Sequence, residues 1–129
     1  MHVVQFERSE RIIWVPVTLW GPLGEQELQF ILDTGTSVTV VNTAIIDKLG
    51  YSAKMGTTRS RLVGVEGAQE GYQLEVKRIA ILGLTIESCE VYCHDFEDRF
   101  GVQGLVGMDL LIDREIFIDG PNGVLKIGP

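Results

Sequence analysis

Fifteen glycines divide the chain into short segments that are rich in β-branched and aromatic residues. Segments 3–6 and 12–19 come first, and the turn Gly-Pro-Leu-Gly at 21–24 separates them from a third segment at 27–32. β-Branched and aromatic residues favour strands, whereas glycine and proline favour the turns between strands. Short strands at this spacing predict an all-β sandwich or barrel rather than alternating strands and helices.

The rest of the chain continues the pattern and adds one helix. Further strands are expected at 59–65, 72–82, 85–92, 115–119 and 124–127. The Asn122-Gly123 pair predicts a type I′ turn between the last two strands. A helix is expected at 43–49, because Asn42 suits its N-cap and Gly50 suits its end. Asp109 is interpreted as a surface residue or as the cap of a short helix at 110–114.

Length and charge limit the classes of function. The 129 residues, 45% of them hydrophobic, predict a single domain over residues 1–129. A net charge of −7 argues against binding to nucleic acid or to anionic membranes, which requires clustered Lys and Arg. No stretch approaches the roughly 20 apolar residues of a membrane span, and residues 1–10 lack the layout of a secretory signal. We therefore expect a cytoplasmic protein with no nucleic-acid or membrane partner.

The two cysteines and the histidines give no sign of a metal site. Cys89 and Cys93 are four positions apart on an expected strand, about 13 Å if extended, which is beyond the reach of a disulfide. They are expected to be free thiols in a reducing compartment. Together with His94 they form a C-x₃-C-H pattern that lacks a second pair of ligands, so the sequence predicts no metal.

Asp33 is the first candidate for chemistry. It directly follows the apolar run Phe30-Ile31-Leu32 and begins the tripeptide Asp-Thr-Gly. By itself the tripeptide is typical of an ordinary turn, because Asp bonds to nearby backbone and Gly tolerates unusual dihedral angles. Two further segments have to be weighed with it: a glycine-bearing hairpin, "RLVGVEGAQEGYQLEV", and the later motif "GLVGMDLL".

In this order, the three motifs resemble those of the retropepsin-like aspartic proteases. The resemblance is greatest to the protease domains of DNA-damage-inducible proteins and to related single-domain bacterial members, and it extends from Ile12 to Ile127. It implies a closed, mostly antiparallel acid-protease barrel with one or two short helices. The implied activity is that of a homodimeric aspartic endopeptidase, which binds its peptide or protein substrate in an extended conformation between a flap and the barrel.

The resemblance also implies a mechanism without metal or cofactor. Asp33 and its copy in a second chain would share one proton and activate a water molecule for peptide hydrolysis. The chain has a single Asp-[Ser/Thr]-Gly triplet, so the pair requires two chains related by a two-fold axis. An acidic pH optimum is the implied consequence.

Individual roles follow from the same resemblance. Thr34 would interlock the two active-site loops, Gly35 would bring its N–H to the Asp33 carboxylate, and the Thr36 hydroxyl would donate to that carboxylate. The segment that supports the loop from behind would be Leu105, Val106 and Gly107. The flap over the substrate would be Val63, Gly64, Val65, Glu66 and Gly67.

Some alternatives stay open. The last hairpin, 115–127, is compatible with β-pairing between two chains and equally with an edge covered by its own chain. Retroviral enzymes have an Arg directly after the second motif, where this chain has Met108, so that ion pair does not carry over. The runner-up function is a catalytically inactive module of the same fold, used for dimerisation or peptide binding. A third is a small ligand-binding barrel in which Asp33 is only a turn residue.

Overall fold

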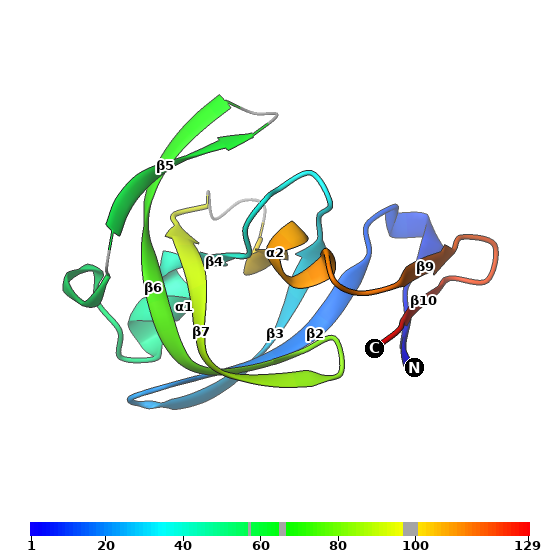
Figure 1. The fold of residues 1–129 in the computed structure, drawn as a ribbon, viewed down its shortest axis with the longest axis horizontal. Coiled ribbons are helices and arrows are strands. Elements are labelled where there is room, and N and C mark those ends of the chain that lie inside the picture. Colours follow the sequence, from blue (N-terminus) through cyan, green and yellow to red (C-terminus); the bar gives the residue numbers. More distant parts are fainter. Residues whose placement is uncertain (57, 65–66, 97–100) are drawn as a thin grey trace.

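The computed structural model describes residues 1–56, 58–64, 67–96 and 101–129, with side chains described for 1–56, 71–96 and 101–129. Most of the described chain is β-structure (Figure 1). The strands are β1 (His2–Gln5), β2 (Trp14–Gly21), β3 (Gly24–Leu32), β4 (Val40–Asn42), β5 (Thr58–Gly64), β6 (Gly67–Ile81), β7 (Leu84–His94), β8 (Gly104–Val106), β9 (Ile116–Asp119) and β10 (Val124–Ile127). The helices are α1 (Thr43–Lys48) and α2 (Met108–Leu111), with 3₁₀ turns η1 (Arg8–Glu10) and η2 (Ala53–Met55).

Six of the strands form a closed barrel. Their order is β2-β3-β8-β4-β7-β6, and pairing of β2 with β6 closes it, while β5 extends the sheet beyond β6. Most pairs are antiparallel, but β3 with β8 and β4 with β7 are parallel. The sequence-based prediction of a closed, mostly antiparallel all-β barrel with one or two short helices is confirmed, and the structure has two. Neither α-helix in the described part of the chain has the length and apolar character that crossing a membrane requires.

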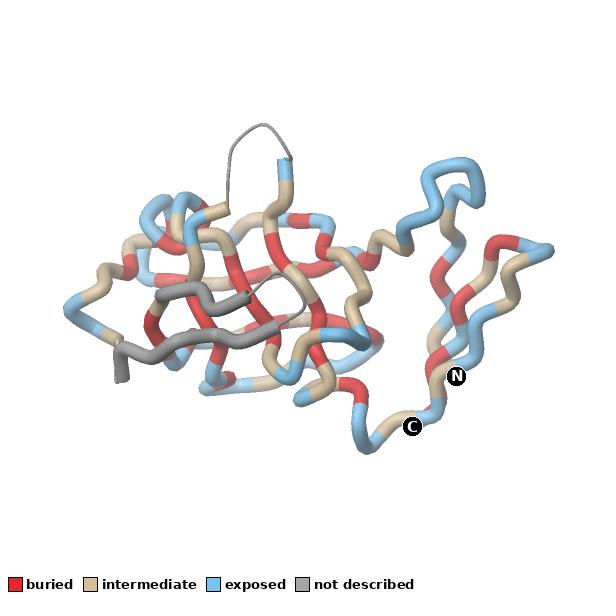
Figure 2. Tube along the Cα trace, turned by 90° about the horizontal axis from the view of Figure 1, so that it is seen from above, coloured by how far each residue is buried: buried red, intermediate tan, exposed pale blue. Residues whose placement is uncertain are grey.

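The interior of the barrel follows from the alternation of residues along its strands. On β2, Val15, Val17 and Leu19 are buried while Pro16 is exposed, as expected where successive side chains point to opposite faces. Phe30 on β3 and Leu74 on β6 belong to the same buried cluster. Figure 2 shows buried positions alternating with less buried ones along the strands of the barrel. Burial of this apolar surface is the main favourable contribution to folding.

Tyr51 ties two strands where the barrel closes. The β2–β6 pairing runs from Val17 with Ile81 to Trp20 with Arg78. At the Trp20 end of this pairing, the Tyr51 hydroxyl donates to the Trp20 carbonyl at 2.6 Å and accepts from the Lys77 N–H at 2.8 Å. A side chain therefore bridges these two strands at the end of their register.

Helix α1 confirms the prediction from its end residues. The Asn42 side chain caps it by accepting from the Ala44 N–H at 3.0 Å. Gly50 follows the helix with φ of +92°, a conformation that favours glycine. The helix buries Ile45 and Ile46 in the core. The observed helix ends at Lys48, one residue before the expected end.

The chain's two terminal segments form a second, three-stranded sheet to one side of the barrel (Figure 1). In this sheet β10 is the central strand, with β1 on one edge and β9 on the other. Leu125 and Ile127 are fully buried, while Val3 and Phe117 are exposed. The structure shows β10 covered on both edges by its own chain, whereas β9 pairs only with β10 among the described strands, so pairing of this hairpin between two chains stays a prediction.

The turn between β9 and β10 differs from the prediction. A type I′ turn at Asn122-Gly123 requires a positive φ at both residues. Gly123 has a positive φ, of 63°, but Asn122 does not. The turn instead spans Gly120 to Gly123, with the Gly123 N–H donating to the Gly120 carbonyl at 3.2 Å. Pro121 accounts for the difference, because its fixed φ suits the second position of a type I turn.

Candidate active site

Asp33 lies where β3 ends, beside β8. Ile31 pairs with Leu105 and Leu32 with Val106 in this parallel contact. One residue further, the Asp33 N–H donates to the Val106 carbonyl at 3.0 Å. The side chain of Asp33 is half-buried. The structure thus brings together the Asp33 loop and the segment 105–107 that the resemblance assigned to its support.

The loop after Asp33 folds back on the carboxylate. The Gly35 N–H donates to Asp33 Oδ1 at 2.8 Å, as the resemblance implied. The Thr36 N–H points to the Asp33 carbonyl at 3.4 Å, and Thr34 and Gly35 are exposed. A non-catalytic turn would also make the bond from Gly35. This geometry fixes the carboxylate at the strand end, and its catalytic role stays a proposal.

Thr36 does not make the contact expected of it. Its hydroxyl donates to the Val38 carbonyl at 3.1 Å. A hydroxyl has one hydrogen, so it cannot donate to Asp33 at the same time. The prediction that Thr36 donates to the carboxylate is therefore wrong for this structure, because a backbone acceptor two residues ahead satisfies the hydroxyl locally.

Residues 106–109 form a strip that lies against residues 36–39. The Met108 N–H donates to the Thr36 carbonyl at 2.9 Å, and the Asp109 N–H donates to the Ser37 carbonyl at 3.1 Å. The approach is close at Gly107, where a Cβ atom would lie 2.3 Å from the Val38 carbonyl oxygen. The strip and the loop therefore hold each other in place through backbone contacts.

Two residues of this arrangement, Thr39 and Asp109, were not identified from the sequence. The Asp109 carboxylate accepts from the Thr39 N–H at 3.0 Å and from the Thr39 hydroxyl at 2.8 Å. Asp109 is exposed, as the first of its two interpretations expected. The second, that Asp109 caps a helix at 110–114, is wrong, because the N-cap of α2 is Gly107. The available signals were a Thr within the apolar run 38–41 and an Asp two positions after Gly107. Neither signal indicates that the two residues meet.

The expected flap falls partly outside the described residues. Val63, Gly64 and Gly67 belong to the β5–β6 hairpin, in which Gly64 pairs with Gly67. Val65 and Glu66 lie outside the described residues. Figure 1 shows the ends of β5 and β6 projecting beyond the barrel at the same end as the Asp33 loop. The position of this hairpin is compatible with a flap.

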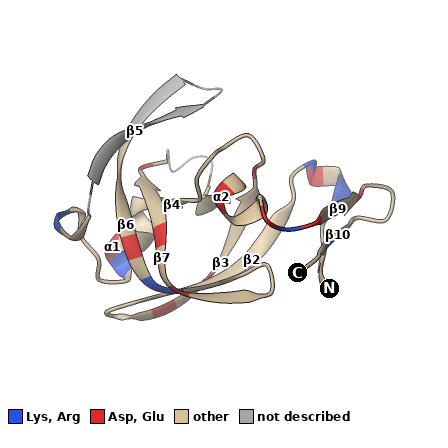
Figure 3. Cartoon of the chain, in the orientation of Figure 1, with Lys and Arg blue, Asp and Glu red and all other residues tan. Residues whose placement is uncertain are grey.

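The titratable groups outside the Asp33 loop are spread out. Acidic and basic residues lie over both the barrel and the terminal sheet in the view of Figure 3.

Burial raises the pKa of the Cys93 thiol to about 12. Burial also raises the pKa of Cys89, and the charges of Asp109 and Glu90 add to the effect. Both thiols are free, and no three metal-binding side chains gather among the described residues.

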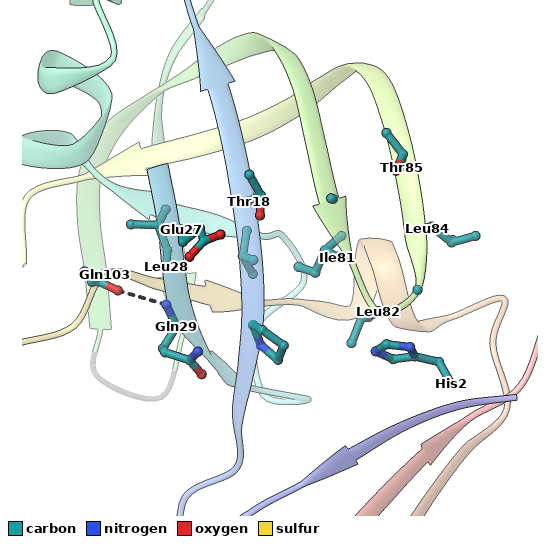
Figure 4. Close-up of a pocket in the computed structure, with 14 residues that line it drawn as sticks. His2, Thr18, Glu27, Leu28, Gln29, Ile81, Leu82, Leu84, Thr85 and Gln103 are labelled. Atoms are coloured by element: carbon teal, nitrogen blue, oxygen red, sulfur yellow. Dashed lines mark hydrogen bonds between the residues drawn. The ribbon is translucent and has the colours of Figure 1, made fainter. Parts of the chain in front are cut away.

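A cavity of about 720 Å³ lies elsewhere, between β2, β3 and the β6–β7 turn (Figure 4). Its lining includes Glu27, Leu82 and Thr85, and Gln103, whose Oε1 accepts from the Gln29 N–H at 2.9 Å. None of the expected site residues whose side chains the structure describes lines this cavity. We therefore assign the candidate active site from the geometry of the Asp33 loop.

Comparisons with known proteins agree on the fold. Residues 15–110 match a family model described as aspartyl protease. A retropepsin-like aspartic protease from Rickettsia conorii is similar, with a TM-score of 0.67 and 16% identity over 97% of this chain and 95% of that chain. The retroviral protease-like domain of Ddi1 from Leishmania major has a TM-score of 0.61 and 20% identity over 90% of this chain and 87% of that chain.

A third similar structure is EIAV protease in complex with the inhibitor HBY-793. It has a TM-score of 0.52 and 23% identity over 79% of this chain and 85% of that chain. No curated protein sequence matches the chain. At such low identities the structural similarities establish the fold alone, whereas the match of residues 15–110 concerns the family.

Proposed function

The chain belongs to the aspartyl protease family, and from this premise we propose that it is a homodimeric aspartic endopeptidase in which Asp33 of each chain forms the catalytic pair. The observation that carries the proposal is the fixed position of Asp33. Its N–H is bonded to Val106 and its carboxylate accepts from Gly35. A reacting group held in one orientation loses little entropy when the reaction begins.

Two chains are needed because one chain supplies one such loop. The sequence contains a single Asp-[Ser/Thr]-Gly triplet, at Asp33. A two-fold axis beside the exposed Thr34 and Gly35 would bring two copies of the loop together at an isologous interface. Thr34 is the residue that we propose to interlock them.

The proposed reaction needs no metal or cofactor. Two carboxylates about 3 Å apart share one proton, because both cannot be ionised at once. The ionised Asp33 takes a proton from a water molecule, whose oxygen attacks the scissile carbonyl carbon. The protonated partner donates to the carbonyl oxygen, which gives a tetrahedral intermediate. Proton transfer to the amine nitrogen then accompanies cleavage of the C–N bond.

An extended peptide is the substrate that suits this fold. Among the described strands, β5 pairs only with β6, so its other edge is open to main-chain hydrogen bonding. We propose that the hairpin at 63–67 covers the peptide while the Asp33 loop lies beneath it. The net charge of −7 supports the further expectation that nucleic acid and anionic membranes are not partners. The cytoplasmic location stays a prediction.

The test is cleavage of an unstructured protein across a range of pH by the wild type and Asp33→Asn. Asparagine keeps the size of the side chain but cannot take or give the proton, so we expect activity to fall by at least about 100-fold. The exposed Asp113 provides the matched control, Asp113→Asn, which should cleave like the wild type. Equal activity of wild type and Asp33→Asn would refute the mechanism. No activity in either would leave the inactive, peptide-binding module as the better interpretation.

Mixing the two proteins tests the requirement for two chains. When wild type and Asp33→Asn are refolded together in equal amounts, random pairing leaves about one quarter of the dimers with two intact Asp33 residues. Activity should then be about one quarter of the wild-type value at the same total concentration. One half is the value expected if each chain acts alone, and that result would contradict the shared site.

A further inference from the structure

The Asp109 carboxylate makes a two-point contact with a single buried residue. One oxygen accepts from the Thr39 backbone N–H at 3.0 Å and the other accepts from the Thr39 hydroxyl at 2.8 Å. Thr39 is completely buried, whereas Asp109 lies at the surface in the first turn of α2. Hydrogen bonds to an ionised acceptor are shorter and stronger than neutral ones. The contact therefore fixes the start of α2 against the segment that precedes β4.

The Thr39 hydroxyl links Asp109 to the backbone next to Asp33 through a second hydrogen bond. While it donates to Asp109, it accepts from the Gly107 N–H at 3.2 Å. Gly107 directly follows Val106, whose carbonyl accepts from the Asp33 N–H. A continuous path of hydrogen bonds and one peptide link thus connects the Asp109 carboxylate to the backbone of Asp33.

The Asp109 carboxylate matches the two donors of Thr39 better than the amide of asparagine would. Both groups that face it, the Thr39 N–H and the Thr39 hydroxyl, are donors. An ionised carboxylate can accept from both, whereas the amide of asparagine has a single acceptor oxygen. The charge of Asp109 also reaches Cys89, whose pKa it raises in addition to the larger effect of burial.

We propose that Asp109 is a positioning residue, which holds Thr39 and Gly107 so that the Asp33 loop keeps the geometry needed for catalysis. This inference rests on the proposed function, since it assigns Asp109 a part in the same reaction. It goes beyond that function because Asp109 makes no contact with the Asp33 carboxylate among the described residues.

The kinetic test compares Asp109→Ala and Asp109→Asn with the wild type. A misplacement of catalytic groups by about 1 Å can lower the rate about 100-fold, so we expect kcat of Asp109→Ala to fall by about that factor while KM stays nearly unchanged. The kcat of Asp109→Asn should lie between those of the wild type and Asp109→Ala, because asparagine retains one acceptor oxygen. Thr39→Ser keeps the N–H and the hydroxyl and should retain most of the activity, whereas Thr39→Val should lose it.

Two controls separate positioning from general destabilisation. Asp113→Ala removes an exposed carboxylate that has no hydrogen bond or ion pair among the described residues, and it should leave kcat unchanged. Tyr51→Phe weakens the barrel at the β2–β6 contact. At a temperature at which both remain folded, Tyr51→Phe should keep its kcat and Asp109→Ala should not. Equal kcat losses in these two variants would overturn the proposal.

Amide hydrogen exchange gives a readout that does not depend on activity. In Asp109→Ala, exchange of the Asp33 and Gly107 N–H groups should become at least about tenfold faster, while the β6–β7 ladder stays as protected as in the wild type. Unchanged exchange at both amides would overturn the positioning role. If exchange is faster in Asp109→Ala but the wild type cleaves nothing, the structural effect of the contact on Asp33 is upheld. The proposed function is then refuted instead.

Discussion

Gly107 shows how a single residue shapes the candidate site. Its φ of −98° is open to any amino acid, so the position does not require glycine for backbone reasons. The requirement is space, because a Cβ atom would lie 2.3 Å from the Val38 carbonyl oxygen and 3.0 Å from the Thr39 nitrogen. Glycine is therefore what allows the 106–109 strip to approach the loop that follows Asp33.

Gly107→Ala should consequently damage both stability and activity. The added methyl group must push the strip away from Val38, and overpacking of this kind costs about 1–3 kcal/mol of unfolding free energy. Urea unfolding and cleavage of an unstructured protein measure the two effects. Gly120→Ala is the matched control, since a Cβ atom there would have no neighbour within 4 Å. If Gly107→Ala is as stable as Gly120→Ala, the close approach is not a constraint.

At this scale the sequence predicted the residues of the local turn better than their distant partners. Asp33 and Gly35 lie two positions apart and form the expected bond. The Thr36 hydroxyl donates to the Val38 carbonyl instead, because a backbone acceptor two residues ahead satisfies its one hydrogen. The contact of Thr39 with Asp109 joins segments 70 positions apart, which no local pattern reports.

At the scale of elements, the closure of the barrel depends on a residue outside the strands. Tyr51 follows α1, yet its hydroxyl satisfies the Trp20 carbonyl on β2 and the Lys77 N–H on β6. Both backbone groups lie next to the end of the β2–β6 register. The tyrosine thus replaces a backbone partner at the point where the two strands stop pairing directly.

Tyr51→Phe should lower the unfolding free energy by about 1–3 kcal/mol, because it leaves two backbone groups of a mostly buried site without their partner. Urea unfolding provides the value. Lys77→Ala is the control, since it keeps the backbone N–H and removes only an exposed side chain, and it should change stability by less than about 0.5 kcal/mol. Equal effects of the two substitutions would show that the hydroxyl contributes nothing.

Elements with strong end signals were the ones that the sequence predicted well. Helix α1 lies between Asn42 and Gly50 as expected, and β10 has the expected bounds. The parallel pairs β3–β8 and β4–β7 were not foreseen, since strand partners depend on the path of the whole chain. The turn at Pro121 differed because the proline outweighed the Asn-Gly signal.

At the scale of the whole molecule, a buried thiol links stability to pH. Burial raises the pKa of Cys93 from 9.0 to about 12 in the folded chain. Between these values the unfolded chain releases the proton and the folded chain keeps it, so the unfolded state is increasingly favoured as pH rises. The contribution of Cys93 is thus fully present below pH 9 and is lost as pH rises toward 12.

The unfolding free energy should fall within this window by about 1.4 kcal/mol per pH unit through Cys93 alone. Urea unfolding at several values between pH 8 and 11 measures the slope in the wild type and in Cys93→Ala. The alanine variant starts from a lower stability because it loses packing, but its curve should be flatter by that amount. Parallel curves would show that Cys93 does not titrate differently in the two states.

The terminal sheet has a consequence for the order in which the molecule assembles. His2 pairs with Ile127, nearly the full length of the chain away. During synthesis β1 is made before the strands of the barrel, whereas its partner β10 is made after them. Pairing over so long a separation is also the slowest kind of contact to form. The apolar Val4 therefore lacks its partner Leu125 until the barrel strands and β10 have been made, so we expect the terminal sheet to form after the barrel.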